Sequence, residues 1–227
     1  MNLVWKIMQH NWWTILWFNF RMLPIRQAIH LPFDFYHKVR FDSKRGKVIL
    51  NTDKLYRGIV KIGGRGSDIF PRKETVLSLD GEIIFAGQTE IGNGASVVVK
   101  KGGTVTFGDR VRLGANTKLY CTDAITFGNE IDVSWESQVF DTDFHHMLDT
   151  ITSQQSAISS PVHIGSYNWI GNRCNIMKGS RLPDHTIVAS GSLINKDYTL
   201  ICKESSMLAG QPAKVVKQNI ARVFEQE

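Results

Sequence analysis

The chain has 227 residues, of which 42% are hydrophobic and 10% aromatic, so it is long and apolar enough to bury a folded core. Its three cysteines are an odd number at wide spacings, which fits neither a disulfide framework nor a CxxC zinc site and favours a reducing cytoplasm. The net charge of +6 comes from the N-terminal part, because residues 1–66 hold 12 Lys or Arg against three Asp.

Residues 1–70 form a basic, aromatic segment. Tryptophans and other apolar residues recur at helical spacing between Trp5 and Leu23, which predicts an amphipathic helix. Such a face beside basic residues is typical of an anionic membrane surface, and we expect peripheral contact through residues 1–40. Packing on the protein's own core or on a second subunit fits the pattern equally well. Lys6, Asn11 and other polar residues interrupt the run, so a spanning helix is not expected.

Residues 71–212 carry an apolar residue at every sixth position. Shorter runs with this step begin at Leu79, Phe107 and Phe127, and the longest comprises Ile164, Ile170, Ile176, Leu182, Val188 and Ile194. A period of six fits neither an α-helix nor an extended strand, but it fits short strands joined by regular corners. The pattern therefore predicts an all-β solenoid built from triangular coils.

The spacing also predicts which side chains stack in successive coils. Three six-residue flats make a coil of roughly 18 residues, so Ile164 is expected to stack on Leu182. By the same step, Ile170 stacks on Val188. We call these apolar positions the rungs of a ladder, and we expect the small or branched residue four positions after many rungs to point inward too. We expect the corners to be supplied by Gly and Asn, for which positive φ is inexpensive. The residues concerned are Gly92, Asn93, Gly94, Gly114, Asn116, Gly171 and Asn172.

The six-residue spacing is interrupted between Val139 and Ile164, which are 25 positions apart. No corner accommodates that length, so a loop of about residues 141–161 must leave the solenoid. It begins with FDTDFHHMLD, which contains two adjacent histidines behind two aspartates. Long loops on a rigid scaffold are frequent sites of function.

The repeat resembles that of the hexapeptide-repeat acyltransferases. DTDFHH before the loop, IGSYNWIGNRCNIMKGS after it and AGQPAKVV at 209–216 make the resemblance more specific, and WFNFRMLPIRQAIHLP is similar to a segment of capsular or lipopolysaccharide O-acetyltransferases. The resemblance implies a left-handed parallel β-helix, a homotrimer and acetyl-CoA bound between neighbouring subunits. After the β-helix we expect a short C-terminal helix over residues 213–227.

By this resemblance the catalytic histidine is His145, which would take the proton of an attacking sugar hydroxyl while the thiolate of CoA leaves. His146 is the alternative base and a candidate substrate contact. Asp143, or alternatively Asp141, would orient the imidazole ring, although each aspartate is also compatible with an ordinary capped turn.

The resemblance also implies which residues meet the substrates. Acetyl-CoA would contact the later coils at Trp169, Gly171, Asn172, Ser190, Asn195, Lys196 and Lys214. Asn195 and Gln211 depart from the usual family pattern, which weakens the assignment of individual contacts. Asn116 and Asp123 are candidate contacts of the acceptor.

These features favour O-acetylation of a sugar in surface polysaccharide biosynthesis by a cytoplasmic enzyme that is peripheral at the inner membrane surface. A lipid-linked acceptor follows if the N-terminal segment contacts membrane. Another small acceptor, such as serine, a nucleotide-sugar amine or an antibiotic, and a scaffold without catalysis are the alternatives. A zinc carbonic anhydrase needs histidines on successive coils, which the spacing of His145, His146, His163 and His185 does not supply, so no metal is expected. Nucleic acid is not expected either, since no recognition motif accompanies the basic residues.

Overall fold

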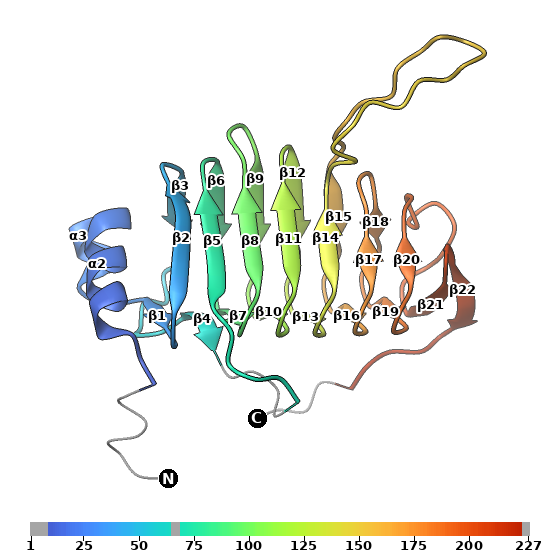
Figure 1. The fold of residues 1–227 in the computed structure, drawn as a ribbon. Coiled ribbons are helices and arrows are strands. Elements are labelled where there is room, and N and C mark those ends of the chain that lie inside the picture. The colour runs from blue at the N-terminus through green and yellow to red at the C-terminus, as the bar shows by residue number, and fades with distance from the viewer. Residues whose placement is uncertain (1–8, 65–68, 224–227) are drawn as a thin grey trace.

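The computed structural model describes residues 9–64 and 69–223, which form a solenoid of parallel strands with two helices at its N-terminal end (Figure 1). The chain passes through three sheets in turn, and each turn of the solenoid adds one strand to each sheet. The cross-section is therefore triangular, with a sheet on each side and a corner at each edge.

The three sheets are named by the order in which the chain enters them. The first sheet holds β1 (Phe33–Phe35), β4 (Val60–Gly64), β7 (Thr89–Gly92), β10 (Val111–Leu113), β13 (Ile131–Val133), β16 (Trp169–Ile170), β19 (Ile187–Val188), β21 (Ser206–Gly210) and β22 (Ala213–Gln218). The second sheet holds β2 (Val39–Lys44), β5 (Thr75–Leu79), β8 (Ser96–Val99), β11 (Lys118–Cys121), β14 (Gln138–Phe140), β17 (Asn175–Ile176) and β20 (Leu193–Ile194). The third sheet holds β3 (Lys47–Leu50), β6 (Glu82–Phe85), β9 (Thr104–Phe107), β12 (Ala124–Phe127), β15 (Val162–Ile164) and β18 (Arg181–Leu182).

The register between strands confirms the six-residue ladder. Ile164 pairs with Leu182 and Ile170 pairs with Val188, as the spacing predicts. The rungs of the longest run are all buried, as are the small residues four positions later. Because parallel pairing without an offset places like positions on top of one another, each turn adds one more layer to a continuous apolar core.

A column of phenylalanines runs through that core. Phe85, Phe107 and Phe127 stack with ring centroids 5.3 Å and 5.1 Å apart and nearly parallel planes. Phe33 packs edge-on against Phe85 at the N-terminal end of the column. All four rings are at most 2% exposed, so the column links successive turns through dispersion contacts.

Glycine has two separate uses at the corners. Of the seven predicted corner residues, Gly94 and Asn116 adopt positive φ and the other five do not, whereas Glu130 and other non-glycine residues do so at equivalent corners. Gly171 does not have a positive φ, and a Cβ there would lie 2.6 Å from the backbone nitrogen of Ser190 in the next turn. Glycine at that position therefore allows close stacking of the coils.

The β-helix begins earlier than residue 71, which corrects the predicted boundary. Phe33 in β1 pairs with Val60 in β4, and Lys47 in β3 pairs with Glu82 in β6, in the same parallel arrangement as the later turns. Long connections after β3 and β4 break the six-residue spacing in this part. The inward residues are apolar there too, but the period that would identify them is lost.

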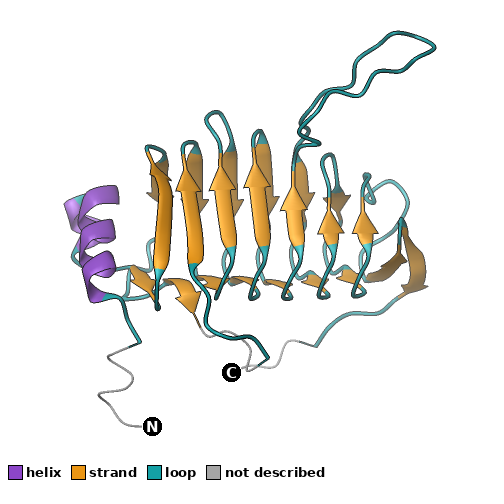
Figure 2. Cartoon of the chain, viewed as in Figure 1, coloured by secondary structure: helices purple, strands orange, loops and turns teal. Residues whose placement is uncertain are grey.

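The helix α2 (Trp12–Met22) covers the N-terminal end of the solenoid and is followed by the short α3 (Ile25–Ala28) (Figure 2). Ile15 and Phe18 are buried against the first turn, and the buried Asn19 amide bonds the backbone N–H and C=O of Phe33. One face of the predicted amphipathic helix thus packs on the protein's own core. Trp5, Lys6 and Met8 of that prediction lie outside the described residues.

The predicted C-terminal helix over residues 213–227 is wrong for its described part. Ala213–Gln218 form β22, which pairs antiparallel with β21, and residues 219–223 are not helical. The β-branched Val215 and Val216 favour a strand, and β21 offers an open edge for pairing. The buried Tyr198 donates its hydroxyl to the carbonyl of Ala213 at 3.1 Å and holds this end in place.

The excursion loop is confirmed and leaves the prism between β14 and β15, at the edge shared by the second and third sheets (Figure 1). At its base the carboxylate of Asp141 is completely buried. It accepts hydrogen bonds from the N–H and hydroxyl of Thr122 and from the N–H of Asp123, at 2.7–3.0 Å. Asp141 therefore ties the start of the loop to the preceding turn.

We expect Phe107→Ala to lower the free energy of unfolding by about 3–5 kcal/mol, because it opens a cavity in the middle of the phenylalanine column. Urea denaturation measures the loss. Thr106→Ala, on the same strand with its side chain outward, is the control and should change it by less than about 0.5 kcal/mol. Equal effects of the two substitutions would contradict the stacking account.

Asp141→Ala should cost about 3 kcal/mol, since it removes the buried carboxylate that accepts hydrogen bonds from Thr122 and Asp123. Asp143→Ala, two residues along the same loop, removes only a partly exposed ion pair and should cost less than about 1 kcal/mol. The same denaturation assay compares the two. A larger loss for Asp143→Ala would show that the loop base has been assigned to the wrong carboxylate.

Candidate functional site

The excursion loop folds back on itself as a narrow ribbon that projects from the prism (Figure 1). Isolated bridges join Thr142 to Ser159 near the base and Leu148 to Gln155 farther out. The two histidines lie on the outgoing arm, beyond the base that Asp141 anchors. The loop thus presents its imidazoles at one edge of the prism, outside the core.

His145 follows an aromatic anchor. Phe144 has a positive φ of 64° and its ring packs 4.9 Å from Tyr120 and 5.8 Å from Phe140, centroid to centroid. A positive φ is costly for a bulky side chain, so the packing of this ring must hold the conformation. His145 is exposed directly after it, and the described residues offer its ring no hydrogen bond.

His146 differs from its neighbour because its ring is held within the loop. Its Nδ1 lies 3.1 Å from the carbonyl oxygen of Ser156 on the returning arm. That contact assigns the proton to Nδ1 when the ring is neutral, since a carbonyl only accepts. Of the two imidazoles, His145 is the one without a structural contact in the described part of the chain.

Neither aspartate contacts a histidine. Asp141 has a structural role at the loop base, where it binds the preceding turn of the solenoid instead of capping a local turn. Asp143 pairs with Lys178, with Oδ2 and Nζ 2.6 Å apart, and Lys178 also donates to the carbonyl of Ala157. Both contacts tie the loop to the turn that follows it. Within the described residues, neither aspartate is therefore placed to orient the imidazole of His145.

The other predicted site residues divide between two edges and one face. Asp123, Asn195 and Lys196 lie with the loop at the edge between the second and third sheets. Asn116, Gly171, Asn172 and Ser190 lie at the edge between the first and second sheets, where the hydroxyl of Ser190 donates to Asn172 Oδ1 at 2.5 Å. Trp169 projects from the outer face of the first sheet, and Lys214 is exposed on β22.

The triangular cross-section of the solenoid separates the predicted site residues from one another. The edge that carries His145 lies opposite the first sheet, as the position of the loop above β13 and β16 shows (Figure 1). Trp169 and the loop that carries His145 therefore lie on opposite sides of the prism within one chain. Any site that uses both must bring the loop edge of one copy to the first sheet of another.

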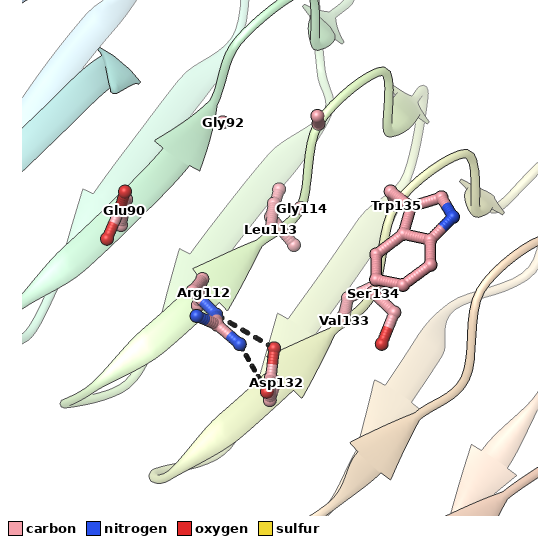
Figure 3. Close-up of a pocket in the computed structure, with 10 residues that line it drawn as sticks. Glu90, Gly92, Arg112, Leu113, Gly114, Asp132, Val133, Ser134 and Trp135 are labelled. Atoms are coloured by element: carbon pink, nitrogen blue, oxygen red, sulfur yellow. Dashed lines mark hydrogen bonds and ion pairs between the residues drawn. The ribbon is translucent and has the colours of Figure 1, made fainter. Parts of the chain in front are cut away.

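The first sheet also carries a pocket that the sequence did not indicate (Figure 3). It is lined on its polar side by Glu90, Arg112 and Asp132, with the indole of Trp135 at one end. Each of the three charged residues comes directly before a buried apolar residue of the six-residue repeat. An alignment of the repeats in the sequence would therefore have placed the three in one column.

The described residues offer few other groups for covalent or metal chemistry. Cys121, Cys174 and Cys202 are buried, and burial raises the pKa of each thiol, which disfavours the nucleophilic thiolate. Within residues 9–64 and 69–223, no group of three or more His, Cys, Asp or Glu side chains is arranged to hold a metal ion.

No family model matches the chain, but several acetyltransferases are similar to it in sequence, including the following three. A probable acetyltransferase of Mycobacterium tuberculosis is 27% identical over 176 residues, 74% of this chain and 53% of the relative. The polysialic acid O-acetyltransferase of Escherichia coli O1:K1 is 26% identical over 125 residues, 55% and 39% of the two chains. A putative lipopolysaccharide biosynthesis O-acetyl transferase of Escherichia coli K12 is 25% identical over 149 residues, 61% and 73%.

The chain thus spans about half the length, or less, of the first two relatives. The crystal structure of a polysialic-acid-specific acetyltransferase superposes with a TM-score of 0.55 at 21% identity, covering 84% of this chain and 91% of that one. This similarity establishes the fold as a left-handed parallel β-helix. The chain is thus similar in sequence to proteins named as acetyltransferases and in fold to a crystallised acetyltransferase.

Proposed function

We propose that the protein is an acetyl-CoA-dependent O-acetyltransferase that modifies a sugar hydroxyl in surface polysaccharide biosynthesis. The observation that carries the proposal is an exposed histidine on a long loop of a hexapeptide β-helix, in a chain similar to two O-acetyltransferases of bacterial polysaccharides. If the β-helix were only a scaffold, nothing would explain why Phe144, with its costly positive φ and its ring packed on Tyr120, positions an exposed His145.

In this proposal His145 is the general base. Its ring takes the proton of the acceptor hydroxyl as the oxygen bonds to the acetyl carbonyl carbon, and the C–S bond of the thioester then breaks to release CoA. His146 is held by Ser156 and would contact the acceptor instead. Asp143 would be a positioning residue for His145. To reach the imidazole, its carboxylate would first have to leave Lys178.

The proposed enzyme is a homotrimer. A ring with threefold symmetry lets each loop edge meet the first sheet of the next subunit, so every subunit contributes to two sites. Trp169, Gly171, Asn172, Ser190 and Lys214 would hold acetyl-CoA from one side, and Asn195 and Lys196 from the other. Asp123 lies beside the loop base and would contact the acceptor, whereas Asn116, on the other edge, would do so only from the neighbouring subunit.

We expect His145→Ala to lower the rate of acetyl transfer by about 10²- to 10⁴-fold, because it removes the base without touching the core. His146→Ala, the matched comparison, removes only a proposed acceptor contact and should retain most of kcat at saturating acceptor. Release of CoA measured with a thiol reagent gives the rate, and circular dichroism checks the fold. A normal rate for His145→Ala together with a large loss for His146→Ala would transfer the role to His146.

We also propose that the N-terminal end of the solenoid contacts an anionic membrane surface, which suits a lipid-linked acceptor. The outward face of α2 and α3 exposes large apolar side chains, which are Trp13, Leu16, Phe20, Ile25 and Ile29. Arg21 and Arg26 lie among them, and residues 9–31 contain no Asp or Glu. Aromatic and basic side chains together suit a lipid interface. Within the described residues no helix combines the length and hydropathy that crossing a bilayer requires.

The double substitution Trp13→Ser and Phe20→Ser should weaken binding to phosphatidylglycerol vesicles by about tenfold or more, because it removes two aromatic anchors. Ile15 and Phe18 on the inner face are kept, so the solenoid remains covered. Vesicle sedimentation measures binding. The control, Leu200→Ser with Ile201→Ser, changes exposed apolar residues far from the helices, and equal binding by both variants would refute the contact.

A further inference from the structure

The pocket on the first sheet lies on the outer face of β7, β10 and β13 and encloses about 280 Å³. Its floor is the Arg112–Asp132 pair, which lies between Glu90 and the indole ring of Trp135 (Figure 3). Ser134 adds a hydroxyl beside the indole. None of these residues belongs to the cofactor contacts, which follow on later turns.

The charges in this pocket are balanced. Arg112 Nε and Nη2 donate to Asp132 Oδ1 and Oδ2 at 2.9 Å and 2.7 Å, and Arg222 Nη1 lies 2.6 Å from the same Oδ2. Because the arginines face a carboxylate and Glu90 adds a second, the site has no excess positive charge to attract a phosphate. It offers alternating donors and acceptors instead, and sugar hydroxyls, which both donate and accept, match that pattern.

Trp135 supplies the apolar part of the pocket. Its indole packs edge-on against Phe70, with ring centroids 6.4 Å apart, and remains partly exposed. A rigid aromatic ring beside a few polar groups is a general arrangement for binding a ligand that has both apolar and polar surfaces. A pyranose ring is such a ligand, because its C–H face is apolar and its hydroxyls are polar.

The height of the pocket along the solenoid agrees with a role in acceptor binding. Asp132 and Trp135 belong to the same turn as β14, from which the loop with His145 departs, and Trp169 pairs with Asp132 from the following turn. Rotation about a threefold axis parallel to the solenoid preserves height. In the proposed trimer, His145 of the next copy would therefore arrive level with the C-terminal end of the pocket.

We propose that this pocket is the acceptor subsite, which binds a sugar ring of the polysaccharide through Trp135, Glu90 and the Arg112–Asp132 pair. The inference rests on the proposed function, because it assigns the sugar that the reaction needs. It predicts that substitutions in the pocket weaken glycan binding and leave acetyl-CoA binding unchanged.

The test uses the full-length protein with His145→Ala as background, so that binding is measured without turnover. A glycan array of bacterial surface polysaccharides measures retention, and calorimetry with acetyl-CoA measures cofactor binding. We expect the background protein to retain at least one glycan. Adding Trp135→Ala, or the conservative Glu90→Gln, should lower that retention about tenfold or more with an unchanged Kd for acetyl-CoA. Adding Leu200→Ala, at an exposed apolar residue outside the pocket, is the control and should leave retention unchanged.

Three results would overturn the assignment. These are retention of no glycan by the background protein, unchanged retention by both pocket variants, or a loss of acetyl-CoA binding in them, which would make the pocket a cofactor site. A failure of the proposed function would look different. The unsubstituted protein would then transfer no acetyl group, while glycan retention would still depend on the pocket.

Discussion

Parallel pairing of successive turns places each inward side chain on its counterpart in the turn before. Because Ile164 must stack on Leu182, and Phe107 between Phe85 and Phe127, no turn can slide or rotate relative to its neighbours. A one-residue slip would turn the apolar column outward. This stacking fixes the height and the edge of every surface residue, and the site is built on those fixed positions.

The same constraint separates the candidate site groups. His145 lies at the edge between the second and third sheets, whereas Trp169 and the pocket of Glu90, Arg112, Asp132 and Trp135 lie on the opposite face. A rigid prism cannot bend to join them. Oligomerisation is therefore part of the proposed chemistry, in which one copy would supply the base and the next would supply the acceptor pocket and Trp169.

The sequence predicted the features that repeat with a fixed period. The rungs from Ile164 to Ile194 and the loop after Val139 are confirmed, because a single constraint, burial at every sixth residue, determines both. The first turns escaped prediction since long connections hide the period around Phe33 to Gly64. The strand at Ala213–Gln218 depends on an edge provided by β21, which is a property of the assembled solenoid.

Side-chain partners were the least predictable part of the site. Asp143 stands two residues before His145, yet it pairs with Lys178 from the turn after the loop. The buried carboxylate of Asp141 accepts hydrogen bonds from Thr122 and Asp123 instead. These contacts join residues that are 18 or more positions apart, and the period fixes which strands meet without fixing which polar atoms pair.

A mixed trimer tests most directly whether the site is shared between subunits. Chains with His145→Ala and chains with Trp135→Ala would be denatured together, refolded as an equal mixture and assayed at an acceptor concentration at which each variant alone is nearly inactive. The shared site predicts recovery of about a quarter of the unsubstituted activity, because about a quarter of the interfaces pair an intact loop with an intact pocket. Activity no higher than that of the separate variants, in mixtures shown to contain both chains, would contradict the account.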